Sequence, residues 1–344
     1  MAKIRIAVAG LNMGYSHLNN YKKDPRAELY AICDSDPKWL DYVAKVENPV
    51  KKFVNFYEMI EDPMIDAISI ALPTKSHAQA VISALEAGKH VLCEKPMAIN
   101  YKEAQAMVQT SENTGKKLMI SHQQRFGSDI QLLKNRQEAG FFGDIYFIRT
   151  GWRRPVGISP RRFDKRANGE IYDHNWFNEK DNGGGVLRDL GTHMIDLAMY
   201  LSGFPVMEGA YGSLYRKFYP EDYDGSYPID AEDLASAHIK FENGMSVQLE
   251  VSFCSHVESE VVFTEIYGTK GGASRRNGEV KFFSSSDDGS FVETVRDCRI
   301  KTKTSQEHFL DAIINNSEVP ITAKQGAEVV RILDAIYESG SDIR

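Results

Sequence analysis

The chain has 344 residues, which suits two domains, and its hydrophobic and charged fractions of 42% and 26% are ordinary for a globular protein. A formal net charge of −7 argues against binding to nucleic acid or to an anionic membrane surface. The four cysteines form no CxxC pair, and no apolar run reaches the roughly 18 residues of a membrane helix. We therefore expect a cytoplasmic protein with reduced thiols.

The first third of the chain alternates apolar strands with amphipathic helices. We expect strands at Ile4–Ala9, Leu29–Cys33, Phe53–Phe56, Ile65–Leu72, Lys89–Cys93 and Lys117–Ser121, and helices from about Tyr15, over Ser76–Ala87 and over Tyr101–Thr114. Such alternation predicts a doubly wound parallel sheet, in which ligands bind beyond the carboxyl ends of the strands.

The first strand, turn and helix have the layout of a dinucleotide-binding site. The run Gly10-Leu11-Asn12-Met13-Gly14 follows the first strand, and Asp34 ends the second strand twenty residues after Gly14. The glycine fingerprint is degraded, because counting back from Gly14 places Ala9 and Leu11 at its first two glycines. Allowing a one-residue deletion places Gly10 first instead, and a plain βα turn stays an alternative. Asp34 favours NAD over NADP, since a carboxylate binds the 2′-hydroxyl and repels a 2′-phosphate.

Two later strand ends carry further polar residues. Pro73 and Thr74 follow one strand, and Glu94 and Lys95 follow the next, at the edge where parallel strands bind ligands. Lys95 is either a solvated loop lysine or a residue that faces the nicotinamide. Pro96 fixes the backbone immediately after it, which favours the second interpretation.

The stretch from Gly183 to Asp196 predicts a catalytic helix. Three glycines precede an apolar pattern at helical spacing, and Asp189 and His193 lie one turn apart on one helix face. Gly191 between them suggests that a ligand passes close to the backbone. One alternative is a satisfied core histidine with a surface or capping aspartate. Another is a metal site, but no third ligand, HExxH motif or cysteine cluster supports it, so we expect no metal.

The chain resembles the glucose–fructose oxidoreductase, inositol dehydrogenase and rhizopine catabolism (Gfo/Idh/MocA) family. The resemblance rests on Glu94-Lys95-Pro96, on the GGGxxxDxGxHxxD run at 183–196, on Pro-Thr-x-x-His at 73–77 and on C-terminal segments such as Phe309–Ile313 and Ile332–Ser339. It implies a Rossmann domain, placed at 1–122, and an α/β domain with a large, mostly antiparallel open sheet, placed at 123–344. The C-terminal helix could pack back on the first domain.

The resemblance also implies NAD(P)-dependent oxidation or reduction of a sugar or polyol hydroxyl, in a homodimer or homotetramer that contacts through the open sheet. The implied catalytic residues are Lys95, Asp189 and His193. The expected cofactor-binding residues are Gly10, Leu11, Asn12, Met13, Gly14, Asp34, Leu72, Pro73, Thr74, His77, Glu94 and Lys95.

The second half changes its periodicity and predicts an antiparallel sheet. After a helix over Ser128–Ala139, we expect strands at Ile145–Gly151, Val206–Tyr215, Leu234–Phe241, Met245–Phe253, Val261–Tyr267, Val280–Ser284 and Phe291–Val295, and closing helices from about Ser305 and Ala323. Asn243-Gly244 is a hairpin turn signal.

The loop over 149–177 is rich in basic and aromatic residues. Residues 149–166 contain seven basic residues and one acidic residue. This excess is either a solvated or intersubunit loop, or the wall of a pocket for a sugar that carries an anionic group. Our candidate substrate-binding residues are Arg125, Trp152, Arg153, Tyr172, His174 and Trp176.

Alcohol oxidation needs a hydride acceptor and a base. An unperturbed imidazole titrates near pH ~6.5 and an ammonium near ~10.4, so we expect His193 to be the base, Lys95 to stabilise the reacting oxygen and Asp189 to hold a neighbouring hydroxyl. Lys95 would be the base if burial removed its proton. Rival functions are an NAD-recycling glycosidase and a non-catalytic regulator, although a regulator need not keep these three residues. The dehydrogenase hypothesis requires Lys95 and His193 to meet at one nicotinamide.

Overall fold

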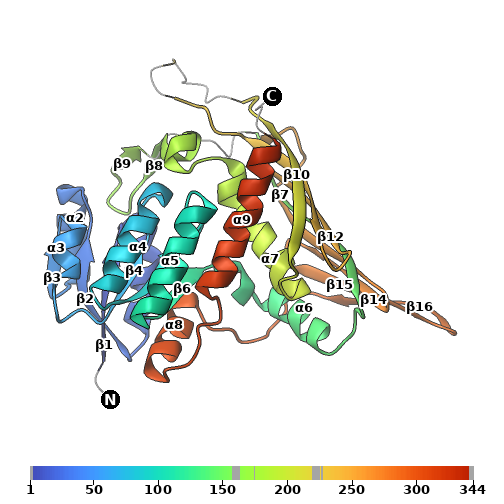
Figure 1. The fold of residues 1–344 in the computed structure, drawn as a ribbon, viewed down its shortest axis with the longest axis horizontal. Coiled ribbons are helices and arrows are strands. Elements are labelled where there is room, and N and C mark those ends of the chain that lie inside the picture. Colours follow the sequence, from blue (N-terminus) through green and yellow to red (C-terminus); the bar gives the residue numbers. More distant parts are fainter. Residues whose placement is uncertain (1–2, 157–162, 174, 219–224, 226–227, 341–344) are drawn as a thin grey trace. The chain divides into compact units, whose positions relative to one another are not determined.

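The computed structural model describes residues 3–156, 163–173, 175–218, 225 and 228–340 (Figure 1). The chain divides into two compact units. The first contains Met1–His122, Lys165–Tyr172 and Lys303–Val330, and the second contains Gln123–Asp164, Asp173–Thr302 and Arg331–Arg344. The domain boundary between residues 122 and 123 stays a prediction, since two later segments belong to the first unit.

A six-stranded parallel sheet forms the first unit. Its order is β3-β2-β1-β4-β5-β6, and every pair in it is parallel. The strands are β1 Ile4–Ala9, β2 Ala27–Cys33, β3 Lys51–Phe53, β4 Ala67–Ile70, β5 His90–Glu94 and β6 Leu118–Ser121. This is the doubly wound order with its switch point at β1 and β4, which confirms the predicted fold class for this part of the chain.

Helices connect these strands. They are α1 Gly14–Lys23, α2 Pro37–Glu47, α3 Phe56–Ile60, the 3₁₀ turn Thr74–Ser76, α4 His77–Glu86 and α5 Tyr101–Thr114. Helices α4 and α5 lie side by side (Figure 1). The sequence analysis did not predict α2, although its signals are present. The Asp36 side chain accepts hydrogen bonds from the backbone N–H groups of Lys38 and Trp39, and Pro37 occupies the first helical position.

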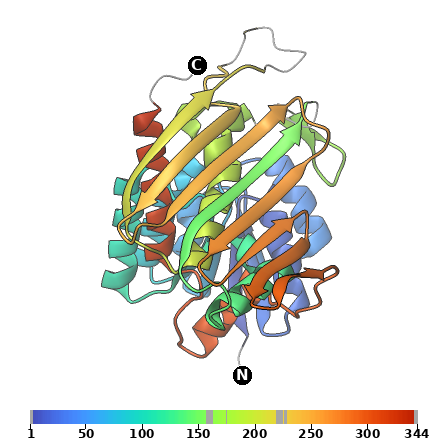
Figure 2. The same ribbon diagram turned by 90° about the vertical axis from the view of Figure 1, so that its right-hand side faces the viewer.

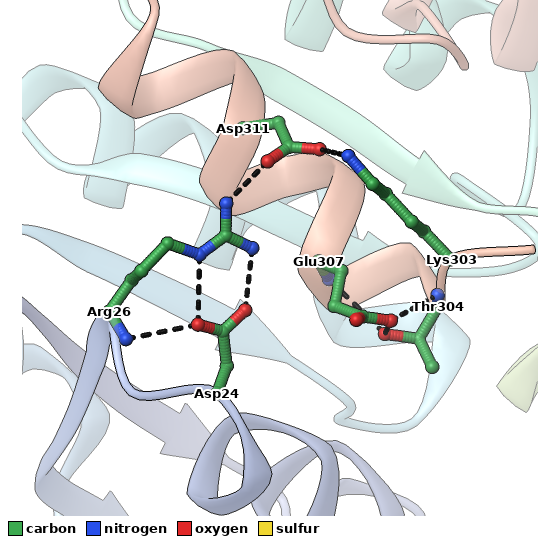
Figure 3. A network of polar contacts seen from close by, with 6 residues as sticks. All are labelled: Asp24, Arg26, Lys303, Thr304, Glu307 and Asp311. Atoms are coloured by element: carbon green, nitrogen blue, oxygen red, sulfur yellow. Dashed lines mark hydrogen bonds and ion pairs between the residues drawn. The ribbon is translucent and has the colours of Figure 1, made fainter.

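A segment from the end of the chain completes the first unit. Helix α8, Ser305–Ile314, begins with a capping box in which Thr304 and Glu307 bind each other's backbone N–H groups. Arg26 forms ion pairs with Asp24 and Asp311, and Lys303 also binds Asp311 (Figure 3). These contacts fasten α8 to the start of β2. Helix α9, Ala323–Ser339, follows.

The second unit is built on an eight-stranded sheet in the order β10-β11-β12-β7-β13-β14-β15-β16. Its strands are β7 Ile145–Pro155, β10 Met207–Tyr215, β11 Leu234–Phe241, β12 Ser246–Ser255, β13 Val261–Gly268, β14 Gly271–Arg276, β15 Glu279–Ser286 and β16 Gly289–Val295. Only the β12–β7 pair is parallel. The mostly antiparallel sheet is therefore confirmed.

The two faces of this sheet differ. Helix α7, Thr192–Ser202, packs on β7 and β12 and contacts α6, Ser128–Glu138. Strand β11 has the burial pattern of a half-covered strand, because Ala235, Ala237 and Ile239 are buried whereas the residues between them are more exposed. Figure 2 views the sheet face on from its other side, which we call the open face. Exposed Tyr211 and Tyr267 lie on the strands of this unit.

Two elements of the second half were not predicted. Strand β14 has the sequence GGASRR, which carries no β-branched or aromatic residue, yet it pairs antiparallel with β13 and β15. A two-stranded hairpin forms from β8 Phe163–Lys165 and β9 Ile171–Asp173. Short 3₁₀ turns lie at Gln123–Phe126, Asn175–Asn178 and Lys180–Asn182.

Candidate active site

The turn between β1 and α1 keeps glycine at the two positions where sterics demand it. Gly10 has φ +82°, and a Cβ there would lie 2.4 Å from the carbonyl oxygen of Ala71. At Gly14 a Cβ would lie 2.8 Å from Val8 Cγ1, so the helix can approach the strand closely only without a side chain. These are the roles of the first and third glycines of a dinucleotide-binding turn. The turn therefore fits a dinucleotide although its fingerprint is degraded.

Asp34 links this turn to the next strand end. One of its carboxylate oxygens accepts a hydrogen bond from the backbone N–H of Leu11 at 2.8 Å, and the other accepts one from the backbone N–H of Asp36 at 2.9 Å. The carboxylate is thus fixed at the carboxyl end of β2, the position of the ribose ligand in this fold. Leu11 is fully buried, whereas Asn12 and Met13 are exposed.

His77 braces the neighbouring strand ends. Its Nε2 lies 2.7 Å from the carbonyl oxygen of Leu72, and its Nδ1 lies 2.9 Å from that of Pro96, which follows a cis peptide bond. Burial lowers the pKa of this imidazole, against the raising effect of both carbonyls. Thr74 is also buried, whereas Pro73 is exposed. This placement favours a supporting role for His77 over direct cofactor contact.

The residue before Lys95 takes part in a buried histidine–glutamate contact that the sequence analysis missed. His17 Nε2 lies 2.7 Å from Glu94 Oε1, and His17 Nδ1 lies 2.7 Å from Ser69 Oγ. Burial alone would raise the pKa of Glu94, but the His17 hydrogen bond and the charges of His17 and Lys95 outweigh it and lower this pKa to about 2. A short polar chain thus joins α1, β4 and β5, and its Glu94 carboxylate also accepts a hydrogen bond from the backbone N–H of Lys95 at 3.2 Å. A buried-face histidine in α1 was the only sequence signal for it.

In the second unit, the triglycine run leads into a π-helical turn rather than a continuous α-helix. Residues Leu187–Gly191 are π-helical, and the α-helix begins at Thr192. A continuous α-helix over this stretch is therefore wrong, whereas the placement of Asp189 and His193 on one helix face stays a prediction. Gly191 is bare for another reason than expected. A Cβ there would lie 2.8 Å from Leu187 Cδ1 and 3.6 Å from Val251 on β12, so the glycine permits packing within the unit.

Glu232 anchors the start of this π-turn. Its Oε1 accepts hydrogen bonds from the backbone N–H of Leu187 at 2.9 Å and from the Tyr337 hydroxyl at 2.8 Å. A Cβ on Gly185, whose φ is +107°, would lie 2.4 Å from the same oxygen. Burial raises the pKa of Glu232, although these hydrogen bonds and Arg188 oppose the rise. Sequence reasoning missed Glu232 as well.

His193 and Trp152 lie together in the second unit. Their ring centroids are 6.0 Å apart, and His193 is 6% exposed. The indole N–H of Trp152 donates to Glu260 at 2.7 Å. Arg125 lies elsewhere, since it is 1% exposed and makes a bidentate pair with the equally buried Asp196 of α7. That placement favours a structural role for Arg125 over substrate contact.

The basic run is largely neutralised by its neighbours. Arg149 and Arg153 pair with Glu250, Arg154 with Glu260, and Arg166 with Asp36. Arg161 and Arg162 lie outside the described residues, as does His174, and of Trp176 only the backbone is described. Tyr172 belongs to the first unit and lies 5.2 Å from the Arg166 guanidinium. Arg149, Arg153 and Arg154 lie on β7 rather than in the predicted loop. Their ion pairs count against a pocket for an anionic sugar, which stays a prediction.

Lys95 belongs to the first unit and Asp189 and His193 to the second. Their joint action at one nicotinamide stays a prediction. Within the described ranges, no group of three or more His, Cys, Asp or Glu side chains could hold a metal ion. None of the helices in the part of the chain that the structure describes is long and apolar enough to cross a membrane.

Comparison with known proteins identifies the family. Residues 4–122 match the model of the oxidoreductase family with an NAD-binding Rossmann fold, and residues 130–274 match the GFO/IDH/MocA C-terminal domain. The chain belongs to the Gfo/Idh/MocA oxidoreductase family. The resemblance inferred from its motifs is therefore confirmed, and its N-terminal part is an NAD-binding Rossmann domain.

Named relatives in this family are dehydrogenases. The chain is 27% identical to the D-glucoside 3-dehydrogenase of Escherichia coli (strain K12), over 98% of this chain and 95% of that protein. It is 26% identical to the scyllo-inositol 2-dehydrogenase (NAD(+)) of Bacillus subtilis (strain 168), over 95% and 91%. Among solved structures, a levoglucosan dehydrogenase in complex with NADH and L-sorbose superimposes with a TM-score of 0.85 at 25% identity, covering 99% and 97% of the two chains.

Proposed function

We propose that this protein is an NAD-dependent dehydrogenase that transfers a hydride between nicotinamide and a secondary hydroxyl or keto group of a neutral sugar, polyol or sugar derivative. The observation that carries the proposal is the carboxyl edge of the six-stranded sheet. There Gly10 and Gly14 let the β1–α1 turn pack tightly against its neighbours, and the Asp34 carboxylate is held at the ribose position, in a chain whose relatives are sugar and inositol dehydrogenases.

The ribose end supports NAD over NADP. Asp34 is a carboxylate that can accept hydrogen bonds from the 2′-hydroxyl, and the next residue is Ser35 rather than an arginine. A 2′-phosphate at this place would face the Asp34 charge. We expect a lower KM for NAD than for NADP, measured at saturating sugar, and the reverse preference would contradict this part of the proposal.

When bound, the nicotinamide accepts the hydride. The remaining chemistry falls to side chains of this chain. His193 removes the hydroxyl proton during oxidation and returns it during reduction. Lys95 donates a hydrogen bond to the reacting oxygen and stabilises its developing negative charge. Asp189 holds a neighbouring hydroxyl of the substrate. The aromatic face of Trp152, 6.0 Å from the His193 ring, can stack on the apolar face of a sugar.

The catalytic assignment is tested by single and double variants. We expect His193→Ala to lower kcat by about 10²- to 10⁴-fold while NADH binding is kept, because only proton transfer is lost. If Lys95 acts in the same step, His193→Ala combined with Lys95→Ala should lose little more than the worse single variant, since residues that act as a unit are non-additive. The measurement is NADH absorbance with a panel of sugars and polyols.

Lys23→Ala and Lys102→Ala are the controls, because both side chains are exposed, on α1 and α5, away from the proposed site and from the open face. They should keep full activity. Full activity of His193→Ala would contradict the assignment of the base. Losses that simply multiply in the double variant would contradict joint action at one substrate. A Lys95→Arg variant that loses the pH dependence of the rate would make Lys95 the base.

Net release of NADH also separates this proposal from its rivals. An NAD-recycling glycosidase would cleave a glycoside without net NADH, and a regulator would do neither.

We also propose a cytoplasmic homo-oligomer that associates through the open face, where the exposed aromatic side chains Tyr211, Tyr267 and Phe283 lie on strands β10, β13 and β15. Light scattering of the purified protein tests this, and a monomer would refute it.

A further inference from the structure

The tip of the β8–β9 hairpin belongs to the dinucleotide-binding unit, although the hairpin follows β7 of the second unit in the chain. Residues Lys165–Tyr172 group with the first unit. The hairpin is closed by its own backbone, since the N–H of Arg166 donates to the Glu170 carbonyl and the N–H of Gly169 donates to the Arg166 carbonyl, each at 2.9 Å. The Asn168 side chain accepts from the Glu170 N–H and stiffens the turn. The hairpin therefore presents Arg166 on an ordered turn.

Arg166 joins two loops of the sheet's carboxyl edge. Its Nε donates to Asn12 Oδ1 at 3.0 Å, and its Nη1 donates to Asp36 Oδ2 at 2.5 Å. The guanidinium lies 5.0 Å from the Trp39 ring of α2 and 5.2 Å from the Tyr172 ring of the hairpin. The side chain is only 10% exposed. An arginine with two hydrogen-bonded partners and two aromatic neighbours is fixed rather than solvated.

These two loops bracket the adenosine half of a dinucleotide in this fold. Asn12 lies in the turn that faces the pyrophosphate, and Asp36 lies two residues beyond the ribose carboxylate of Asp34. Asp36 is also the cap of α2, through the N–H groups of Lys38 and Trp39. The Arg166 hydrogen bond lowers the pKa of Asp36, so the two groups stay a charged pair. Arg166 thus places a positive charge between the turn at Asn12 and the carboxylate of Asp36.

We propose that Arg166 is a positioning residue for the adenosine diphosphate half of the cofactor, and that the hairpin over 165–172 is a clasp that slows its release. The inference rests on the proposed use of NAD. A planar guanidinium held between two loops can fix both loops around the nucleotide and offset the charge of its phosphates. The sugar and the nicotinamide are not its partners, so its loss affects the cofactor and not the chemical step.

The test measures cofactor binding without any sugar. We expect Arg166→Ala to weaken NADH binding about tenfold, mainly through faster dissociation in stopped-flow fluorescence, because a charge-assisted hydrogen-bond network is removed. ADP-ribose, which shares only the adenosine half, should weaken by the same factor in calorimetry. The KM for NAD should rise while kcat at saturating NAD stays within about twofold, and Arg166→Lys should recover part of the loss.

Arg296→Ala is the matched control, since its side chain is 75% exposed on the second unit and pairs only with Glu279 in the part of the chain that the structure describes. It should bind NADH like the wild type. If Arg166→Ala has a clearly lower melting temperature than the wild type without ligand, Asp36→Asn is the test of the clasp instead. Asparagine still caps α2 but cannot form the ion pair. A several-fold weaker NADH affinity in that variant supports the clasp.

Unchanged NADH binding in Arg166→Ala, or in Asp36→Asn where that variant decides, would overturn the inference. Tighter binding would overturn it too, since the hairpin would then obstruct the site. A loss for NADPH more than tenfold larger than for NADH would make Arg166 a 2′-phosphate ligand instead. A wild-type protein that binds neither NADH nor ADP-ribose would refute the proposed function itself, which separates the two failures.

Discussion

Two buried glutamates stand behind the predicted catalytic residues, and they differ in charge. Glu94 precedes Lys95 at the end of β5, and Glu232 holds the π-turn that carries Asp189. The exposed fractions of the two residues are 6% and 2%. Yet the pKa of Glu94 is lowered to about 2, whereas that of Glu232 is raised. Burial is the first cause in both cases, so it is the partners that decide the outcome.

The partners explain the difference. Glu94 has the His17 imidazole at 2.7 Å and the charge of Lys95 nearby, which favour its ionised form. Glu232 is bound by a backbone N–H and a tyrosine hydroxyl, and the charge of Arg188 has a smaller effect than either, so burial prevails. An ionised Glu94 keeps a negative charge beside Lys95. A carboxyl group that resists ionisation at Glu232 fixes the π-turn without adding charge next to Asp189.

Removing the imidazole gives the largest expected effect. His17→Ala should lower the free energy of unfolding by about 3–5 kcal/mol, because a buried carboxylate loses its partner. Chemical denaturation followed by circular dichroism measures this. Adding Glu94→Gln to His17→Ala should recover most of the loss, since no charge is then buried alone. A loss below about 1 kcal/mol in the single variant, compared with the exposed-site control Lys102→Ala, would mean that Glu94 is not ionised.

The Gly185→Ala substitution, which crowds the Glu232 carboxylate, should have the next largest effect. Gly185→Ala should cost about 2–4 kcal/mol, because its φ of +107° disfavours any side chain and its Cβ would lie 2.4 Å from the Glu232 carboxylate. Gly244→Ala is the matched control, since φ there is +84° with no atom within 4 Å of the new Cβ. It should lose only the backbone part, about 1 kcal/mol. Equal losses in the two variants would show that Glu232 moves aside freely.

The smallest effect is a pair of opposite pH slopes. Glu94 has a folded pKa below its unfolded value, so its contribution is present above pH ~4.5 and is lost as pH falls toward about 2. Glu232 has a folded pKa above its unfolded value, so its contribution is present below pH ~4.5 and is lost as pH rises through the folded pKa.

Thermal melts of Glu94→Gln and Glu232→Gln across pH 3 to 8 would separate these slopes. Glu94→Gln should melt at a lower temperature than the wild type at neutral pH, and this difference should shrink as the pH falls. Glu232→Gln should become more stable relative to the wild type as the pH rises, because only the wild type must ionise a buried carboxyl group. The change is up to about 1.4 kcal/mol per pH unit for one proton. Parallel curves for the two variants would show that both glutamates have the same charge state.

The sequence alone determined the parts governed by local periodicity and local sterics. The alternation of strands and helices in the first 122 residues predicted the parallel sheet, and α5 begins and ends where predicted, with Asn100 as its cap and Gly115 after it. The glycine at position 10 also indicated the turn after the first strand, where the structure has a positive φ. The family motifs marked Lys95, Asp189 and His193 as candidates, whose roles stay predictions.

Only the tertiary structure decided what depends on residues far apart in the chain. His17 and Glu94 are separated by 77 positions, and nothing local marks them as partners. Strand β14 has poor strand propensity and forms because both of its neighbours pair with it. The π-turn at Leu187–Gly191 and the pairing of Arg166 with Asp36 are also set by packing and by distant carboxylates. Burial and charge pairing are properties of the folded chain, so no window of sequence contains them.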